Sequence, residues 1–228
     1  PYVKDTSPQE AAKTVEEELQ AVKVPLCVGG SGNPEKDPKV FKKIAEIGAG
    51  ERLLINSVNR DMDLEEACKP IADHGHAVIA FSPMDLDIAR EVVRKARDFL
   101  TRDSIVIDLN TGGIGYGFEY GFTTAERGRI AALKGDEELQ HPLVAAGSNA
   151  WAAREAWLKM DPFWGPKDIR GPLWETLTSL GMLLVGADYF MITHPLTVKT
   201  LRKVIDLLLS GKRGEKKEIY NWISSKLG

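Results

Sequence analysis

The chain has 228 residues, of which 43% are hydrophobic and 28% are charged, and its formal net charge is -3. This apolar content suffices for one full core, and one domain is the expected number at this length. The absence of a basic face argues against a nucleic-acid partner. No apolar run approaches the ~20 residues that a membrane-spanning helix needs, and no signal peptide is recognisable, so we expect no membrane partner.

The sequence contains two cysteines, Cys27 and Cys68, each within an apolar stretch. Two cysteines give no disulfide framework, and this usage indicates the reducing cytoplasm. They are also too few to hold an iron–sulfur cluster, which usually takes about four thiolates. Any such cluster is therefore expected on another chain.

Strand and helix patterns alternate along the sequence. The first helix is expected at 8–22, where Ser7 and Glu10 form a capping box and Pro8 takes the first helical position. Strands are expected at 24–28, 53–55, 77–81, 104–109, 142–146 and 187–192. Further helices are expected at 37–48, 63–75, 85–99, 122–134 and 172–185 and from 197, with caps at Asp63, Asp85 and Thr197.

Three local features modify this pattern. Pro70 predicts a kink or a late start in the third helix, because proline inside a regular helix costs ~3 kcal/mol. The stretch 149–172 is expected to be irregular. The helix at 172–185 is almost wholly apolar, so we expect it to be covered on most sides.

Strands that alternate with helices predict βαβ units and a parallel sheet, hence an α/β fold. Six strands fit either a doubly wound sheet or a TIM-type (β/α)8 barrel that lacks its first two strands. The chain reaches a helix at residue 8 with no strand before it, which favours the barrel and suggests a missing upstream segment. We expect the barrel domain at 1–210 and a charged tail at 211–228.

Both architectures place active sites at the carboxyl ends of the strands. The residues that follow the predicted strands are unusually polar, whereas the strand beginnings lack this richness. The candidate binding residues at these ends are Gly30, Asn33, Asn56, Ser82, Asp85, Asp108, Asn110, Thr111, Gly112, Asn149 and His194.

Asn56, Asp108 and Asn149 stand out among these candidates. A carboxylate and two amides at one barrel mouth match the donor–acceptor edge of a flat heterocycle. The alternative is that each side chain caps a helix or closes a turn.

Two loops leave alternatives open. The loop 29–33 could cradle a phosphate, although it matches neither the dinucleotide nor the phosphate-loop fingerprint, and a plain tight turn is the alternative. The loop 112–122 mixes glycines with aromatics, so it could dock a ring system or a partner chain. Its alternative is a compact loop that packs its own aromatic side chains.

His194 follows a predicted strand, so a site role is plausible, whereas His74, His76 and His141 lie at the opposite ends and are expected to be structural. No two histidines have metal-ligand spacing, and no Gly-x-Ser-x-Gly elbow is present, so hydrolase chemistry lacks support. The segment 149–175 is rich in Trp and Arg, which are enriched in interface hot spots. Its alternative is that some of the tryptophans are core residues.

Four segments carry a family resemblance. They are GGSGNPEKDP at 29–38, GSNAW at 147–151, WGP at 164–166 and RGPLWE at 170–175. They resemble the small subunit of the corrinoid iron–sulfur protein, which in archaea is the delta subunit of the acetyl-CoA decarbonylase/synthase complex. The likeness extends over residues 3–210.

The resemblance implies a TIM-type barrel that pairs with a large subunit. That partner carries the iron–sulfur cluster and a corrinoid-binding domain, and the barrel mouth faces the corrinoid. Methyl groups then pass from a methylated pterin to acetyl-CoA synthase, so methyltransferase and CO dehydrogenase components are further implied partners. Family members carry an additional N-terminal stretch with the first barrel strands.

The barrel is also similar to the wider pterin-binding family, in which positions matching Asn56, Asp108 and Asn149 hold the pterin ring. Three hypotheses follow. The chain is a corrinoid-protein subunit, or a pterin-dependent methyltransferase acting on a corrinoid protein, or a structural subunit that docks larger enzymes through its Trp–Arg stretch.

Overall fold

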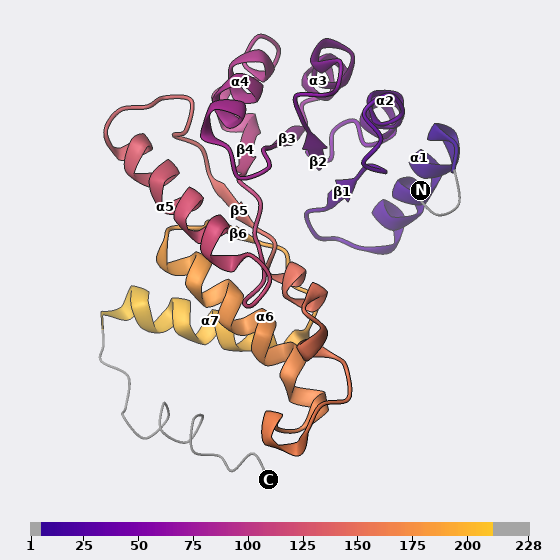
Figure 1. Cartoon of the computed structure of the whole chain (residues 1–228). Coiled ribbons are helices and arrows are strands. Elements are labelled where there is room, and N and C mark those ends of the chain that lie inside the picture. Colours follow the sequence, from indigo (N-terminus) through magenta and orange to yellow (C-terminus); the bar gives the residue numbers. More distant parts are fainter. Residues whose placement is uncertain (1–5, 212–228) are drawn as a thin grey trace. The chain divides into compact units, whose positions relative to one another are not determined.

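The computed structural model describes residues 6–211, which fall into two compact units. Unit 1 comprises Pro1–Asn110 and Glu126–Val144, and unit 2 comprises Thr111–Ala125 and Ala145–Gly228 (Figure 1). The expected division into a domain at 1–210 and a tail at 211–228 stays a prediction, because residues 212–228 lie outside the described part.

Unit 1 is built on parallel strands that pair in chain order. Its strands are β1 (Cys27–Gly29), β2 (Leu54–Val58), β3 (Ala77–Phe81), β4 (Ile105–Asp108) and the start of β5 (Leu143–Ala145). Val78, Ile79 and Ala80 on β3 are all fully buried. A continuous apolar run of this kind is typical of a parallel strand covered on both faces, so the predicted parallel α/β sheet is confirmed.

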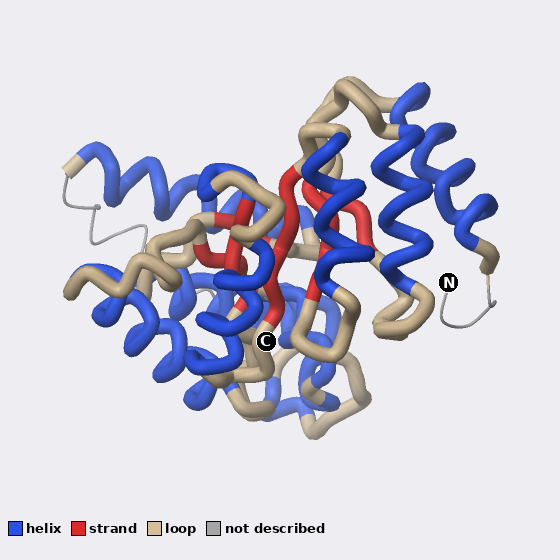
Figure 2. Tube along the Cα trace, turned by 90° about the horizontal axis from the view of Figure 1, so that it is seen from above, coloured by secondary structure: helices blue, strands red, loops and turns tan. Residues whose placement is uncertain are grey.

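The helices of unit 1 form a row along these strands. They are α1 (Pro8–Ala21), α2 (Asp37–Ile47), α3 (Leu64–Asp73) and α4 (Leu86–Ala96), and the 3-10 turn η1 (Arg102–Ser104) precedes β4. Each of the four helices packs against the next, and Figure 2 shows them side by side beside the strands. The predicted capping box of Ser7 and Glu10 is present, and Asp63 and Asp85 cap α3 and α4 as expected.

Unit 2 is mainly helical. Its elements are η2 (Gly147–Ala152), η3 (Arg154–Ala156), η4 (Pro162–Trp164), α6 (Lys167–Leu184), β6 (Tyr189–Phe190) and α7 (Pro195–Ser210). Helix α5 (Phe118–Leu133) begins in unit 2 and ends in unit 1. The Met191 amide donates to the Ala145 carbonyl at 3.0 Å, which joins the end of β5 to the segment after β6, and α6 packs on α7.

Several predicted boundaries were wrong. Helix α7 begins at Pro195 with His194 as its cap, while the expected cap Thr197 is buried inside the first turn. Helix α6 begins at Lys167, so Pro172 lies inside it rather than at its start. Helix α5 begins at Phe118, so the second half of the predicted glycine–aromatic loop is helical.

The predicted cover of the helix at 172–185 is confirmed, because only Leu177 and Leu184 in that range are exposed, at 38% and 76%. Its buried residues include Glu175, whose carboxylate accepts hydrogen bonds from backbone amides, so part of the inner face of α6 is polar. Pro70 lies inside α3, which nevertheless begins at Leu64 without a late start.

His76 confirms the structural role expected for it. The ring is fully buried, its Nδ1 accepts from the Leu53 amide at 3.1 Å, and its Nε2 lies 3.0 Å from the Ala45 carbonyl. The imidazole thus bridges α2 to the start of β2. His141 is likewise buried, with its Nδ1 3.2 Å from the Ile105 carbonyl.

The loop between β1 and α2 is closed by a buried carboxylate. Asp37 is 1% exposed, and its Oδ1 accepts from the Ser31 amide at 2.8 Å and from the Ser31 hydroxyl at 2.6 Å. Its Oδ2 accepts from the Gly32 amide at 2.8 Å. A Cβ on Gly30 would lie 2.5 Å from Asp37 Oδ2, so only glycine fits there.

This geometry predicts that Asp37→Asn destabilises the chain. The asparagine offers one acceptor oxygen, and its NH2 group would face a backbone N–H that has no other partner. We expect the free energy of unfolding, measured by urea denaturation, to fall by about 2 kcal/mol. Asp98→Asn is the matched control, because Asp98 is exposed in the turn that follows α4. Equal urea midpoints for the two variants would contradict this account.

Candidate functional site

In unit 1, backbone hydrogen bonds tie the candidate residues of neighbouring strand ends. The Gly30 amide donates to the Asn56 carbonyl at 2.9 Å, and the Ser82 amide donates to the Asp108 carbonyl at 2.8 Å. Asn56 is half-buried and lies where the pairing of β2 with β3 shifts register. Asp108 ends β4, and β3 lies between its strand and that of Asn56.

Asp108 is a candidate whose side-chain pKa is raised. Its carboxyl group is 8% exposed, and burial raises its pKa from 3.8 to about 6, against the lowering effect of the hydrogen bond from the Asn110 amide. That amide donates to Oδ1 at 2.8 Å, and Asn110 adopts a left-handed backbone with φ of 64°. Asparagine tolerates this conformation well. Within residues 6–211, Oδ2 has no hydrogen-bond partner.

Other candidates in unit 1 are occupied by local structure. The Asn33 side-chain oxygen accepts from the Glu35 amide at 2.9 Å and from the Lys36 amide at 3.2 Å. The Ser82 hydroxyl donates to the Asp85 carbonyl, and the Asp85 carboxylate caps α4. These side chains therefore close turns or cap a helix, which was the alternative interpretation.

The phosphate-cradle interpretation of the loop 29–33 was wrong. The Ser31 and Gly32 amides already donate to the Asp37 carboxylate, and the Gly30 amide donates to Asn56. Each backbone amide carries one hydrogen, so these groups are not free for a phosphate. The Asp37 carboxylate therefore occupies the position that a bound phosphate would take.

In unit 2, Asn149 has a fixed orientation. Its Nδ2 donates to the Thr111 carbonyl at 2.8 Å, and the Thr111 hydroxyl accepts from the Ala146 amide at 3.1 Å. Thr111 is buried, whereas Asn149 is exposed. Because Nδ2 is engaged by the backbone, the Oδ1 of Asn149 remains available as an acceptor.

The loop that begins at Gly112 is compact. A Cβ on Gly112 would lie 2.3 Å from the Gly117 backbone, so the loop closes on itself. Phe118 and Phe122 pack against each other with ring centroids 5.5 Å apart. Tyr116 and Tyr120 are nevertheless 64% and 66% exposed. The loop thus packs its phenylalanines against each other, as the compact-loop interpretation expected. Its tyrosines are exposed to solvent, as the docking interpretation expected.

His194 lies between β6 and α7 and is half-buried. Its Nδ1 accepts from the Leu196 amide at 3.1 Å, and its ring stacks with that of Trp151 at 6.4 Å between centroids. Glu175 of α6 holds the same loop: it is fully buried, and its carboxylate accepts from the Thr193 and His194 amides at 2.7 and 3.0 Å. The sequence analysis missed Glu175, although a lone acidic residue in an apolar helix was a usable signal.

The Trp–Arg stretch is partly core and partly surface. Arg170 is 2% exposed, and its guanidinium donates to the Glu155 carbonyl at 2.8 Å and to the Leu158 carbonyl. Trp157 and Trp164 are about half exposed, and Phe163 is 94% exposed. Arg170 is therefore a structural residue rather than a free interface residue.

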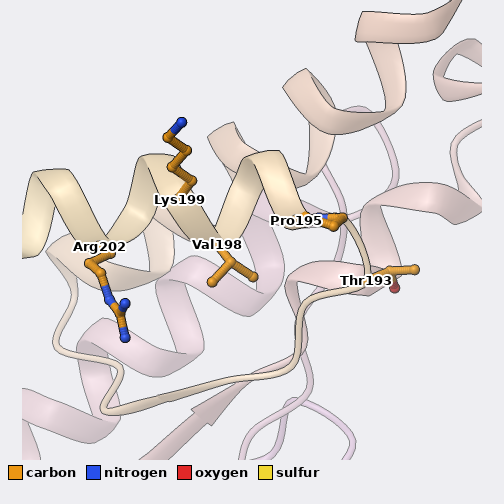
Figure 3. A pocket seen from close by; sticks show the side chains of 5 residues that line it. All are labelled: Thr193, Pro195, Val198, Lys199 and Arg202. Atoms are coloured by element: carbon orange, nitrogen blue, oxygen red, sulfur yellow. The ribbon is translucent and has the colours of Figure 1, made fainter.

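Beside His194 lies a shallow hollow of about 390 Å³. It is lined by Thr193, Pro195, Val198, Lys199 and Arg202. Figure 3 shows the side chains of Lys199 and Arg202 leaving α7 on opposite sides. The two cations do not converge on one ligand, so the hollow is not an evident anion site.

The candidate residues are divided between the two units. Unit 1 holds Asn56 and Asp108, and unit 2 holds Asn149 and His194. The predicted site in which Asn56, Asp108 and Asn149 together bind a flat heterocycle stays a prediction. In the described part of the chain, no group of His, Cys, Asp and Glu residues could hold a metal ion.

Among residues 6–211, no helix is both long enough and apolar enough to cross a membrane.

Solved structures with this fold include dihydropteroate synthases. A Yersinia pestis structure, described as DHPS with a pterine-sulfa conjugate, matches with a TM-score of 0.60 at 15% identity, covering 89% of this chain and 76% of that one. A dihydropteroate synthetase with Product1 matches with a TM-score of 0.61 at 14% identity, covering 87% and 72%. These likenesses confirm the expected α/β fold of the TIM-barrel type.

Curated relatives are acetyl-CoA decarbonylase/synthase complex delta subunits. The subunit from Methanosarcina mazei is 42% identical over 100% of this chain and 54% of its own length. Those from Archaeoglobus fulgidus and Methanothermobacter thermautotrophicus are 43% and 48% identical, over 98% and 90% of this chain and 51% and 52% of their own lengths. The chain thus spans about half the length of the curated relatives it matches.

The family model of the CO dehydrogenase/acetyl-CoA synthase delta subunit matches residues 3–160. This match and the identities above confirm the resemblance noted in the sequence, and the chain belongs to the family of CO dehydrogenase/acetyl-CoA synthase delta subunits.

Proposed function

We propose that the chain is the barrel-type subunit of a corrinoid iron–sulfur protein. It holds the corrinoid together with a large partner subunit, which carries the iron–sulfur cluster. The assembly supports methyl transfer between a methylated pterin and acetyl-CoA synthase, with methyltransferase and CO dehydrogenase components as further partners, in the cytoplasm. Family membership and the relatives' names as complex subunits support this proposal.

The observation that carries the proposal is the donor set at the strand ends. Asn149 presents an oriented amide, and the stacked pair of Trp151 and His194 presents flat aromatic surface in the same unit. Such a set suits the edge of a corrinoid, because the periphery of that ring is rich in carboxamides.

When bound, the corrinoid supplies the methyl-carrying chemistry of cobalt, and the protein supplies orientation and exclusion of water. Asn149, Trp151 and His194 would hold the edge of the ring in unit 2. No acid–base pair on this chain is required for that role.

A second candidate function is a pterin-dependent methyltransferase acting on a corrinoid protein. The acidity of Asp108 favours it, because a carboxyl group with a pKa of about 6 retains a proton closer to neutral pH than an ordinary aspartate. Such a group suits protonation of a leaving-group nitrogen.

The first prediction concerns the partner. Under anaerobic conditions, the purified chain should co-elute with the corrinoid-bearing large subunit on size exclusion and shift the visible spectrum of the cobalt corrinoid. The shift is expected because the barrel would change the polarity and water access around the ring. Co-elution with an unchanged spectrum would leave only a structural docking role, and absence of co-elution would refute the proposal.

The second prediction separates the two candidate functions. Isothermal titration calorimetry of the chain alone with a methylated pterin should give no heat of binding if the chain is a corrinoid subunit. A saturable heat that Asn56→Ala and Asn149→Ala abolish would favour the methyltransferase. Glu119→Ala is the control, because Glu119 is exposed and lies outside the candidate set.

The third prediction uses the raised pKa of Asp108. Burial favours the protonated form, so the contribution of Asp108 to stability is fully present below pH 3.8 and is lost as the pH rises through about 6. Asp108→Asn, which keeps the acceptor for the Asn110 amide, should be more stable than the parent chain at pH 8 by up to about 3 kcal/mol. The difference should shrink towards pH 4. Urea denaturation at several pH values measures it, and a gap independent of pH would contradict the assignment.

A further inference from the structure

His194 is held more tightly than its role as a helix cap requires. Its backbone amide donates to Glu175, its Nδ1 accepts from Leu196, and its ring stacks with Trp151 at an interplanar angle of 29°. A cap needs only the second of these contacts. The others fix the loop and the plane of the ring.

The hydrogen bond from Leu196 also fixes the tautomer of a neutral His194. An Nδ1 that accepts a hydrogen bond carries no proton, so the proton of the neutral ring resides on Nε2. Within residues 6–211, Nε2 has no protein partner, and the residue is half-buried rather than covered. The ring therefore presents an oriented and unused N–H donor.

Glu175 is what keeps this loop in place. Its carboxylate is fully buried in α6 and has the Thr193 and His194 amides as partners at 2.7 and 3.0 Å. The Thr197 hydroxyl, one turn into α7, donates to the Pro172 carbonyl at 3.3 Å. Helix α6 thus anchors both the loop before α7 and the first turn of α7.

The surroundings of His194 favour a neutral ligand over an anion. The buried carboxylate of Glu175 lies against the backbone of the same loop, and its charge opposes a second negative charge nearby. The side chains of Lys199 and Arg202 diverge in Figure 3 and offer no joint counter-charge. Asn149, in the same short turn as Trp151, presents an acceptor oxygen that a carboxylate would meet unfavourably.

We propose that Glu175 is a positioning residue that holds His194 so that its Nε2–H donates to the carbonyl oxygen of a ligand carboxamide. Asn149 Oδ1 accepts from the NH2 group of a ligand carboxamide, and Trp151 forms the apolar wall beside His194. The inference rests on the proposed function, because the periphery of a corrinoid carries such carboxamides. It assigns the recognition of that periphery to four named residues of unit 2.

Two substitutions of His194 separate binding from folding. His194→Asn keeps an oxygen that caps α7 in place of Nδ1 but removes the ring and Nε2–H. His194→Gln places an amide N–H near the position of Nε2 but loses the cap. Glu175→Gln leaves one of the two loop amides facing an NH2 group, and Glu119→Gln is its matched control on the surface of the same unit.

The experiment titrates the complex of this chain and its large partner, stripped of cofactor, with aquocobinamide. A second titration uses the same corrinoid with its peripheral amides hydrolysed to carboxylates. The visible spectrum gives the dissociation constants. Independently of the ligand, ¹⁵N NMR of the histidine rings reports the tautomer of His194.

We expect the amide-bearing corrinoid to bind the parent complex more tightly than the hydrolysed one. His194→Asn should weaken its binding about tenfold, the loss of one hydrogen bond, and should lower the urea midpoint less than His194→Gln does, because it keeps the cap. His194→Gln should retain binding within about threefold while lowering the urea midpoint, because it keeps a donor and loses the cap. Glu175→Gln should weaken binding and convert the single Nε2–H tautomer of His194 into a mixture, and Glu119→Gln should do neither.

The outcomes separate this inference from the proposed function. If the parent complex binds neither corrinoid, the proposed function itself fails. If it binds the amide form but His194→Asn binds equally well, only the inference is overturned. Tighter binding of the hydrolysed form would overturn the assignment to a carboxamide, and an unchanged His194 tautomer in Glu175→Gln would overturn the positioning role.

Discussion

The loops at the strand ends depend on buried carboxylates whose partners are backbone amides. Asp37 does this in unit 1 for the loop between β1 and α2, and Glu175 does it in unit 2 for the loop between β6 and α7. A buried carboxylate is costly unless its oxygens accept hydrogen bonds, and a buried loop amide is costly unless it donates one. In each arrangement the carboxylate accepts hydrogen bonds from the loop amides, so both kinds of buried group have partners. The loop is thereby fixed to a helix.

Helix α6 extends this principle with a buried cation. Arg170, one and a half turns before Glu175, donates to the carbonyls of Glu155 and Leu158. One helix thus holds carbonyls of the segment after β5 with a guanidinium and amides of the loop after β6 with a carboxylate. Loops that are held by a rigid helix can orient functional side chains, which mobile loops do poorly.

The proposed role, in which the chain presents a cofactor, is supported by how many polar side chains at the strand ends already have a local task. Asn33 closes a turn and Asp85 caps α4, for example. In unit 2, the Asn149 side-chain oxygen, the His194 ring and the Trp151 ring remain, and under the proposed function they contact a planar ligand whose own atoms do the chemistry.

The sequence by itself determined the alternation of strands and helices, the caps at Ser7, Asp63 and Asp85, and the family. These features are local: a period of hydrophobic residues, a short capping pattern or a short segment that resembles the family reports them directly. It also selected Asn149 and His194, since polar residues after strands lie at one end of a parallel sheet.

Only the tertiary structure decided which of those side chains are available to contact a ligand. The loop 29–33 looked open to phosphate until Asp37, a residue assigned only to helix initiation, was seen to fill it. The sequence marked Glu175 only as a lone acidic residue in an apolar helix, and its task of holding the loop before α7 depends on partners 18 and 19 positions away in the chain. The acidity of Asp108 and the tautomer of His194 likewise come from burial and hydrogen bonding in three dimensions, which a pattern of residue types along the chain does not encode.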